Sequence, residues 1–180
     1  ELAEKEVART SSYPPAQAVA RHYQTRLTEV YEYWLRWNQD ITKAFQALEA
    51  AGKVELIASA ATHGFLPLLA PNRIAVECQI GIGVEAFQRC FGHPPRGFWL
   101  PECGYYPGLD EILAAWGVQY TILDSHGLLN ASPKPRHAVY APIQTRNQVY
   151  FFGRDWESSR QVWSATEGYP GDPVYRDFYR

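Results

Sequence analysis

The sequence lacks methionine altogether and contains only three cysteines, Cys78, Cys90 and Cys103. An odd number of cysteines without a Cys-x-x-Cys pair predicts reduced thiols in a cytoplasmic protein rather than a disulfide framework. Every apolar stretch is broken within about ten residues, short of the roughly 20 that a membrane span needs, so no span is expected. The first residues lack the pattern of a secretory signal. The missing initiator methionine and an end at Arg180 without a stop signal indicate a piece of a longer protein.

Positive charge is also scarce. The 17 lysines and arginines are outnumbered by 19 acidic residues, which gives a formal net charge of -2, and no basic block occurs. A nucleic-acid partner is therefore not expected, because surfaces that follow phosphates need clustered Lys and Arg. Aromatic residues, in contrast, make up 14% of the chain. This content suits either a dense core or the flat, apolar faces of sugars.

Helical and extended patterns alternate along the chain. After a polar stretch at 1–13 that is expected to fray, apolar residues at three-to-four spacing predict one long helix, closed by Gly52, whose apolar face packs on a core. The predicted helices span 16–52, 74–91, 108–117 and 157–164, the predicted strands span 54–60, 97–100, 120–123 and 149–153, and 126–148 is a loop or an irregular hairpin. This order predicts an α/β fold with a parallel sheet and crossover helices.

Ionisable residues follow the predicted strands. The ends of parallel strands converge on one rim of the sheet, where α/β enzymes place their active sites. The residues at these ends are His63 after the first strand, Glu102 after the second, Asp124 and His126 after the third, and Arg154 and Asp155 after the fourth. We therefore expect a functional site at this rim.

Glu102 follows an apolar strand and precedes Cys103-Gly104-Tyr105-Tyr106. A carboxylate held beside aromatic residues can attack an anomeric carbon, with a second carboxyl group about 5 to 5.5 Å away in a retaining mechanism. The alternative is a surface or helix-capping glutamate. Cys103 is interpreted as a small packed thiol, because no general base stands at a diagnostic spacing from it.

His63 has several possible roles. It can hydrogen-bond a ligand hydroxyl, bind a metal, or be an ordinary turn residue between Thr62 and Gly64. A zinc site would combine it with Glu102, Asp124 and His126, but no closely spaced His-x-x-x-His pair supports one. No metal or other cofactor is predicted.

Residues 152–173 are rich in glycine, proline and aromatics and suit the wall of a binding site. Trp163 can stack on a sugar ring in such a wall, where Arg154 and the backbone at Gly171 can reach the sugar hydroxyls. The alternative is a core tryptophan beside a structural turn.

Three stretches resemble glycoside hydrolase family 57, and within it the α-1,4-glucan branching enzymes. They are Ala-Thr-His-Gly-Phe-Leu-Pro-Leu-Leu at 61–69, Gly-Phe-Trp-Leu-Pro-Glu-Cys-Gly-Tyr at 97–105, and Gly-Arg-Asp at 153–155 continuing into Val-Trp-Ser at 162–164 and Glu-Gly-Tyr-Pro-Gly-Asp-Pro at 167–173. The resemblance runs from Tyr23 onward and implies an incomplete (β/α)7 barrel. Residues 1–180 are accordingly expected to be a fragment of one catalytic barrel domain.

The resemblance also implies roles for individual residues. Glu102 matches the family's nucleophile, which forms a glucosyl ester in a retaining double displacement. His63 matches a histidine of the donor sugar site, Arg154 and Gly171 match substrate contacts, and Trp163 matches an aromatic wall of the cleft. The implied function is branching, in which a chain of an α-1,4-glucan such as glycogen or amylose passes to a 6-hydroxyl of another glucan.

Two departures from the family pattern leave alternatives open. The family's first histidine motif would lie before residue 1 and its acid/base aspartate after residue 180, so the chain alone is expected to be inactive. The stretch from His126 to Val149 is shorter than the mobile loop of branching enzymes, which leaves a hydrolase or a 4-α-glucanotransferase of the same family. A non-catalytic α-glucan-binding module and a metal-dependent deacetylase are further alternatives.

Overall fold

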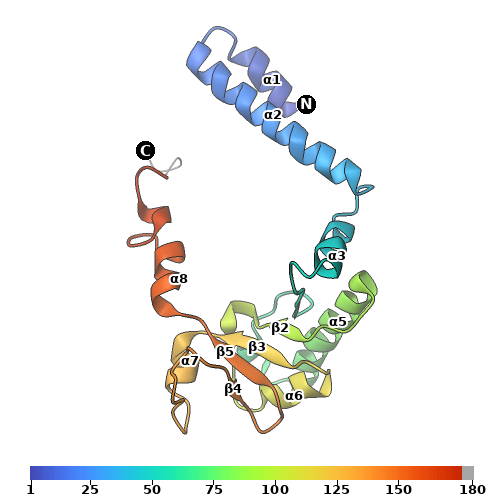
Figure 1. Ribbon diagram of the computed structural model, residues 1–180, viewed down its shortest axis with the longest axis vertical. Coiled ribbons are helices and arrows are strands. Elements are labelled where there is room, and N and C mark those ends of the chain that lie inside the picture. The colour runs from blue at the N-terminus through green and yellow to red at the C-terminus, as the bar shows by residue number, and fades with distance from the viewer. Residues whose placement is uncertain (176–180) are drawn as a thin grey trace. The chain divides into compact units, whose positions relative to one another are not determined.

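The computed structural model describes residues 1–175, which form two compact units (Figure 1). The first unit, Glu1–Glu55, contains the helices α1 (Leu2–Arg9), α2 (Pro14–Arg36) and α3 (Thr42–Ala50). Two sequence predictions are wrong here. The first residues, which were expected to fray, form α1, and the long helix predicted to run to Gly52 is divided into α2 and α3.

The division between α2 and α3 lies at residues 37–41. Asn38 and Gln39 adopt positive φ angles of 53° and 63°, which a continuous right-handed helix does not allow. Asp40 then accepts a hydrogen bond from the backbone N–H of Thr42 at 3.1 Å, which supports the start of α3. The apolar spacing continues through the break, so periodicity alone does not detect it.

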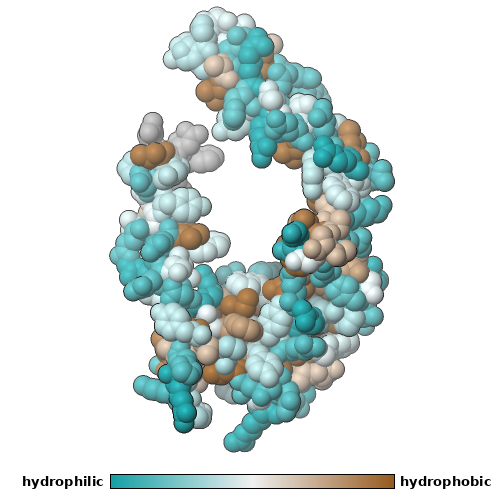
Figure 2. All heavy atoms as spheres, viewed as in Figure 1, coloured by the Kyte–Doolittle hydropathy of each residue, from teal (hydrophilic) through white to brown (hydrophobic). Residues whose placement is uncertain are grey.

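The apolar face predicted to pack on a core is exposed. Within residues 1–55 the only buried apolar side chains are Ala20 and Ala44. α1 lies along α2, where Gln17 Nε2 donates to the carbonyl oxygen of Val7 at 3.3 Å, but it covers that face only in part. Figure 2 shows hydrophobic atoms at the surface of these helices. The exposed residues of the predicted face are Val19, Tyr23, Leu27, Val30, Trp34, Ile41, Phe45 and Leu48.

The second unit begins at Leu56 and is built on a five-stranded sheet. In spatial order its strands are β1 (Ala58–Ser59), β2 (Gly97–Trp99), β3 (Tyr120–Leu123), β5 (Tyr150–Gly153) and β4 (Ile143–Gln144). β1, β2, β3 and β5 are parallel, with Phe98 opposite Thr121 and Thr121 opposite Phe151. β4 runs antiparallel to β5, so residues 126–148 include one strand of a hairpin. All four predicted strands are present, the first reduced to two residues.

Helices connect the parallel strands. They are α4 (Leu66–Leu69) and α5 (Arg73–Phe91) between β1 and β2, α6 (Leu109–Ala115) between β2 and β3, α7 (Ser125–Leu129) after β3, and α8 (Trp156–Trp163) after β5. α5 begins where the Asn72 side chain accepts a hydrogen bond from Ala75 N–H at 3.3 Å, and it ends at Gly92, whose φ is 81°. The helix predicted at 74–91 is confirmed, and with it the α/β class with parallel strands and crossover helices. No helix among the described residues has the length and apolar character to span a membrane.

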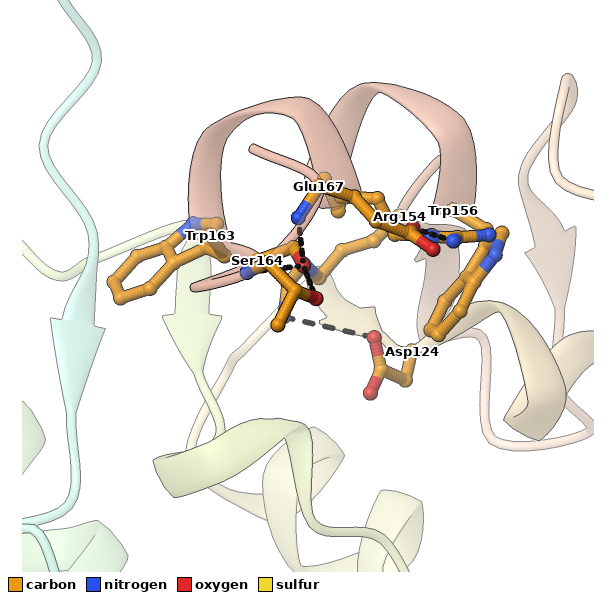
Figure 3. A pocket seen from close by; sticks show the side chains of 9 residues that line it. Asp124, Arg154, Trp156, Trp163, Ser164 and Glu167 are labelled. Carbon is orange, nitrogen blue, oxygen red and sulfur yellow. Dashed lines mark hydrogen bonds and ion pairs between the residues drawn. The ribbon is translucent and has the colours of Figure 1, made fainter. Parts of the chain in front are cut away.

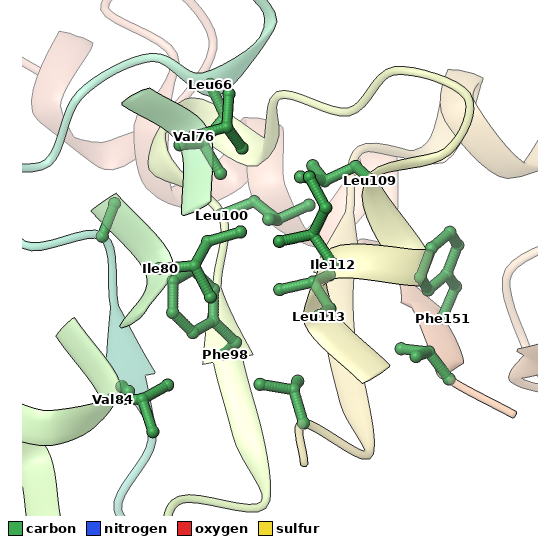
Figure 4. Close-up of a cluster of buried hydrophobic side chains, with 14 of the residues drawn as sticks. Leu66, Val76, Ile80, Val84, Phe98, Leu100, Leu109, Ile112, Leu113 and Phe151 are labelled. Carbon is green, nitrogen blue, oxygen red and sulfur yellow. The ribbon is translucent and has the colours of Figure 1, made fainter. Parts of the chain in front are cut away.

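The core of the second unit gathers apolar side chains from α5, α6 and the sheet (Figure 4). Phe98 of β2 is fully buried among them. The backbones of α5 and β1 approach so closely that a Cβ on Gly83 would lie 2.1 Å from the carbonyl oxygen of Ser59. This contact fixes the position of the strand that leads to His63. The labelled members of the core are Leu66, Val76, Ile80, Val84, Phe98, Leu100, Leu109, Ile112, Leu113 and Phe151.

Candidate active site

Side-chain contacts connect the residues that follow neighbouring strands. His63 follows β1 and its Nε2 lies 4.0 Å from Oε1 of Glu102, which follows β2. Arg154 follows β5, and its Nη1 lies 3.5 Å from Oδ1 of Asp124, which follows β3. The same Nη1 lies 3.9 Å from the sulfur of Cys103, next to Glu102. The structure therefore brings the predicted residues of all four parallel strand ends to one rim.

A strained turn carries Glu102. Pro101 opens a short 3₁₀ turn, Pro101–Cys103, in which Cys103 N–H donates to the carbonyl oxygen of Leu100 at 2.8 Å. Glu102 and Cys103 both have a φ of 53°, a left-handed conformation that residues other than glycine rarely adopt. Such strained residues cluster at active sites and ligand-binding sites. The strained turn leaves the Glu102 carboxylate exposed, with 79% of the side chain accessible, and buries Cys103 beneath it.

His63 is oriented by Ser59. The Ser59 hydroxyl donates to the carbonyl oxygen of Trp99 at 3.0 Å and lies 3.3 Å from His63 Nδ1. Because the single hydroxyl hydrogen is used at Trp99, Ser59 accepts from Nδ1–H, and Nε2 is the atom that faces Glu102. In the neutral ring, Nε2 is then an acceptor for a hydroxyl group. His63 also has a positive φ, of 56°.

The loops of His63 and Glu102 are packed against each other. A Cβ on Gly104 would lie 2.4 Å from the ring of Phe65, so this position accommodates the ring only because it is glycine. Phe65 is two residues after His63, and Gly104 is two residues after Glu102. The contact therefore sets the spacing between the imidazole and the carboxylate.

Arg154 is held between two partners. Its backbone N–H donates to the carbonyl oxygen of Leu123 at 2.9 Å, and its guanidinium group contacts Asp124 and Cys103. Burial raises the pKa of the Cys103 thiol, although Arg154 acts against this effect. The thiol is therefore protonated near neutral pH, which favours the packed-thiol interpretation over a nucleophile.

A cavity of about 570 Å³ lies beside this rim, between the ends of β3 and β5 and the helix α8. Figure 3 shows Trp163 and Trp156 at opposite ends of it, with Asp124 nearer to Trp156. Trp163 is 77% exposed and Arg154 lines the same cavity, so both predicted sugar contacts are at one site. Arg160 and Glu167, which form an ion pair, close its other side.

Gly171 and Asp155 have structural contacts. Gly171 ends the turn Tyr169–Gly171, where its N–H donates to the carbonyl oxygen of Gly168 at 2.9 Å. Its Cβ would lie 2.5 Å from the carbonyl oxygen of Ala165, and it does not line the cavity. Asp155 caps α8 by accepting from Ser158 N–H at 2.8 Å. Hydrogen bonds from Ser158 hold the pKa of Asp155 below its ordinary value.

Sequence reasoning missed Ser59, Phe65 and Trp156. Ser59 lies inside a predicted strand four residues before His63, and Trp156 directly follows Arg154-Asp155, so proximity to predicted residues was the available signal. Phe65 acts through a tertiary contact that no local pattern encodes. Among residues 1–175, no three His, Cys, Asp or Glu side chains are placed to hold a metal ion, and the four candidate zinc ligands do not form such a group.

Comparison with known proteins identifies the family. Residues 4–173 match Glycosyl hydrolase family 57. The chain belongs to this family. The expectation drawn from the three sequence stretches is thus confirmed, and the parallel sheet with crossover helices is consistent with part of a (β/α)7 barrel.

Relatives with different activities resemble this family 57 chain. A 1,4-alpha-glucan branching enzyme of Thermococcus kodakarensis is 36% identical over 181 residues, which cover 84% of this chain and 26% of that protein. The crystal structure of the alpha-amylase AmyC of Thermotoga maritima is 43% identical with a TM-score of 0.90, covering 99% of this chain and 35% of its own. The crystal structure of the GH57-type branching enzyme of Pyrococcus horikoshii is 32% identical with a TM-score of 0.83, and the match covers 99% of this chain and 37% of that one. The chain spans about a quarter of the curated branching enzymes it matches.

Proposed function

We propose that this chain carries the nucleophile and part of the donor sugar site of an α-glucan branching enzyme that acts on glycogen-type or amylose-type chains in the cytoplasm. Residues 1–180 are then a fragment of one catalytic barrel domain. The observation that carries the proposal is the position of Glu102: an exposed carboxylate on a strained turn, 4.0 Å from His63. Its neighbour Cys103 contacts Arg154, which lines the cavity with the exposed tryptophans.

In the first step, an oxygen of Glu102 forms a bond to the anomeric carbon of a glucose unit while the glycosidic C–O bond breaks. The leaving oxygen takes a proton from an acid, which the family resemblance assigns to an aspartate beyond residue 180. His63 accepts a hydrogen bond at Nε2 from a hydroxyl group of the donor sugar. Arg154 binds the sugar from the other side of the rim, and Trp163 stacks on a ring. The role of Gly171 is a contact through its carbonyl oxygen, because its N–H is already bonded in the turn.

In the second step, the 6-hydroxyl of another glucan attacks the anomeric carbon of the glucosyl ester, and the bond between that carbon and the Glu102 oxygen breaks. The hydroxyl proton passes to the aspartate, and the Glu102 carboxylate is released. The same intermediate attacked by water gives hydrolysis. Attack by a 4-hydroxyl gives 4-α-glucan transfer. Hydrolysis is the second candidate function, since the alpha-amylase of Thermotoga maritima resembles this chain with 43% identity.

The test uses the natural full-length polypeptide and amylose. Glu102→Gln is expected to lower kcat by at least about 10³-fold while glucan binding persists, because the amide cannot form the ester. Glu85→Gln, a change of an exposed glutamate in α5 away from the rim, is the matched control and leaves kcat unchanged. Retained turnover in the Glu102→Gln protein would remove Glu102 as the nucleophile.

Product analysis separates the two candidate functions. Branching creates chains that a debranching enzyme releases, without a matching rise in reducing ends. Hydrolysis raises the reducing ends and creates no branch points. A glucan-binding module would show neither product while still binding amylose.

A further inference from the structure

A second cavity, of about 510 Å³, adjoins the first. The two cavities share Asp124 and Trp156 in their linings. His126 and Leu129 of α7 and Glu157 of α8 line the second cavity only. The shared residues make the two cavities neighbours along the same rim. The sugar contact proposed for Trp163 lies in the first cavity and leaves the second without a function.

Trp156 is the wall between the cavities. Its side chain is 58% exposed, and the guanidinium carbon of Arg160 lies 5.5 Å from the centre of its ring. Arg160 lines the first cavity and is not among the residues that line the second. The part of the indole that faces the second cavity is therefore available to a ligand.

The lining of the second cavity combines the two kinds of group that a sugar requires. Trp156 and Leu129 provide apolar surface for the C–H face of a pyranose ring. His126, Asp124 and Glu157 provide polar atoms for its hydroxyl rim. His126 and Glu157 are exposed, so their polar groups can bind a ligand without first losing a buried partner.

We propose that this second cavity is a further subsite for the α-1,4-glucan, in which Trp156 stacks on a glucose unit beyond the one held at Trp163. The subsite rests on the proposed function, because it takes the substrate of the same rim. It makes Trp156 a determinant of chain length: a short oligosaccharide fills the first cavity alone, whereas a longer one extends past Trp156 into the second.

The test measures binding of maltotriose and maltoheptaose by calorimetry to the full-length Glu102→Gln protein, which prevents turnover. Adding Trp156→Ala is expected to raise the Kd for maltoheptaose about tenfold and that for maltotriose by a much smaller factor, because Trp156 also lines one end of the first cavity. Trp156→Phe retains an aromatic face and is expected to keep most of the affinity. His126→Ala, which changes the second cavity alone, is expected to weaken maltoheptaose binding selectively as well. Trp34→Ala, at an exposed tryptophan of α2, is the control and changes neither Kd.

Three outcomes would overturn the subsite. An unchanged Kd for maltoheptaose in both the Trp156→Ala and the His126→Ala proteins removes it while the proposed function stands. Equal weakening for the two oligosaccharides places Trp156 in the first site rather than in a further one. No binding of either oligosaccharide to the Glu102→Gln protein removes the proposed function together with the subsite.

Discussion

The two units use their apolar residues in opposite ways. In the second unit, α5 and α6 bury their apolar faces against the sheet, and Phe98, Leu113 and Ile80 are fully buried. In the first unit, α2 has an equally regular apolar face, yet Leu27 at its centre is 56% exposed. A three-to-four spacing therefore predicts a helix and the face that is apolar, but it does not predict that residues of the same unit cover that face.

The difference also bears on function. Every residue of the candidate active site lies in the second unit, where a close-packed core fixes the strand ends. Preorganised catalytic groups need such support, because small displacements of reacting groups cost large factors in rate. The first unit has no comparable core of its own.

The largest expected difference between the units comes from a matched pair of leucines. Leu113→Ala leaves a cavity in the core and is expected to cost about 2–5 kcal/mol of stability. Leu27→Ala removes an exposed side chain and is expected to change stability by less than about 0.5 kcal/mol. Amide hydrogen exchange measures both, read from peptides of β2 and β3 for the first variant and of α2 for the second. Equal losses in the two variants would show that α2 is buried as deeply as the core.

Two glycines fit their positions for different physical reasons, one because of close packing and one because of its backbone conformation, and alanine substitutions compare the two costs. Gly83→Ala places a methyl group against the Ser59 carbonyl and is expected to cost about 1–3 kcal/mol, although alanine normally favours a helix. Gly52→Ala meets no neighbouring atom but must adopt a φ of 65°, at a cost of about 1 kcal/mol.

A further substitution at position 52 separates the cost of backbone conformation from the cost of close packing. Gly52→Asn is expected to recover most of the loss, because asparagine tolerates the left-handed region. No such rescue exists at Gly83, where any side chain meets backbone. The check is hydrogen exchange in α3 for position 52 and in β1 for position 83. A stabilising Gly83→Ala would contradict the close approach of α5 to β1.

The effect expected only at alkaline pH is a pH dependence at Tyr105. Burial, reinforced by the nearby Asp110 carboxylate, raises the pKa of Tyr105 to about 12. In the unfolded chain the pKa is about 10, so folding favours the neutral phenol. The contribution to stability is complete below about pH 10 and is lost as the pH rises through about 12. The free energy of unfolding, measured by denaturation at each pH across this window, is expected to fall less steeply with pH for Tyr105→Phe than for the unaltered protein. Identical slopes would contradict the raised pKa of Tyr105.

Local signals in the sequence predicted much of the second unit. Apolar runs bounded by Pro and Gly mark β2 and β3, and α5 is long enough to be recognised as a helix. Because parallel strands end on one rim, their order was sufficient to bring His63 and Glu102 together. The roles of these residues stay predictions, since proximity of side chains does not by itself establish chemistry.

Other features depend on contacts that no local pattern contains. The break at Asn38 and Gln39 interrupts no apolar spacing, and the exposure of α2 depends on which segments cover it. Gly171 lies in a glycine-rich stretch that suits a sugar contact, but its N–H is used within a tight turn. Trp156 forms a wall of two cavities only because residues of α7 and α8 together line the second one.

The most direct test of the central claim is to trap the ester. A fluorinated α-glucosyl fluoride that slows the second step is incubated with the full-length protein, and the labelled peptide is identified by mass spectrometry. The glucosyl group is predicted on the peptide that contains Trp99-Leu100-Pro101-Glu102, with fragmentation placing it on Glu102. A label on a different carboxylate, or turnover of the compound without any labelled peptide, would contradict the assignment of Glu102 as the nucleophile.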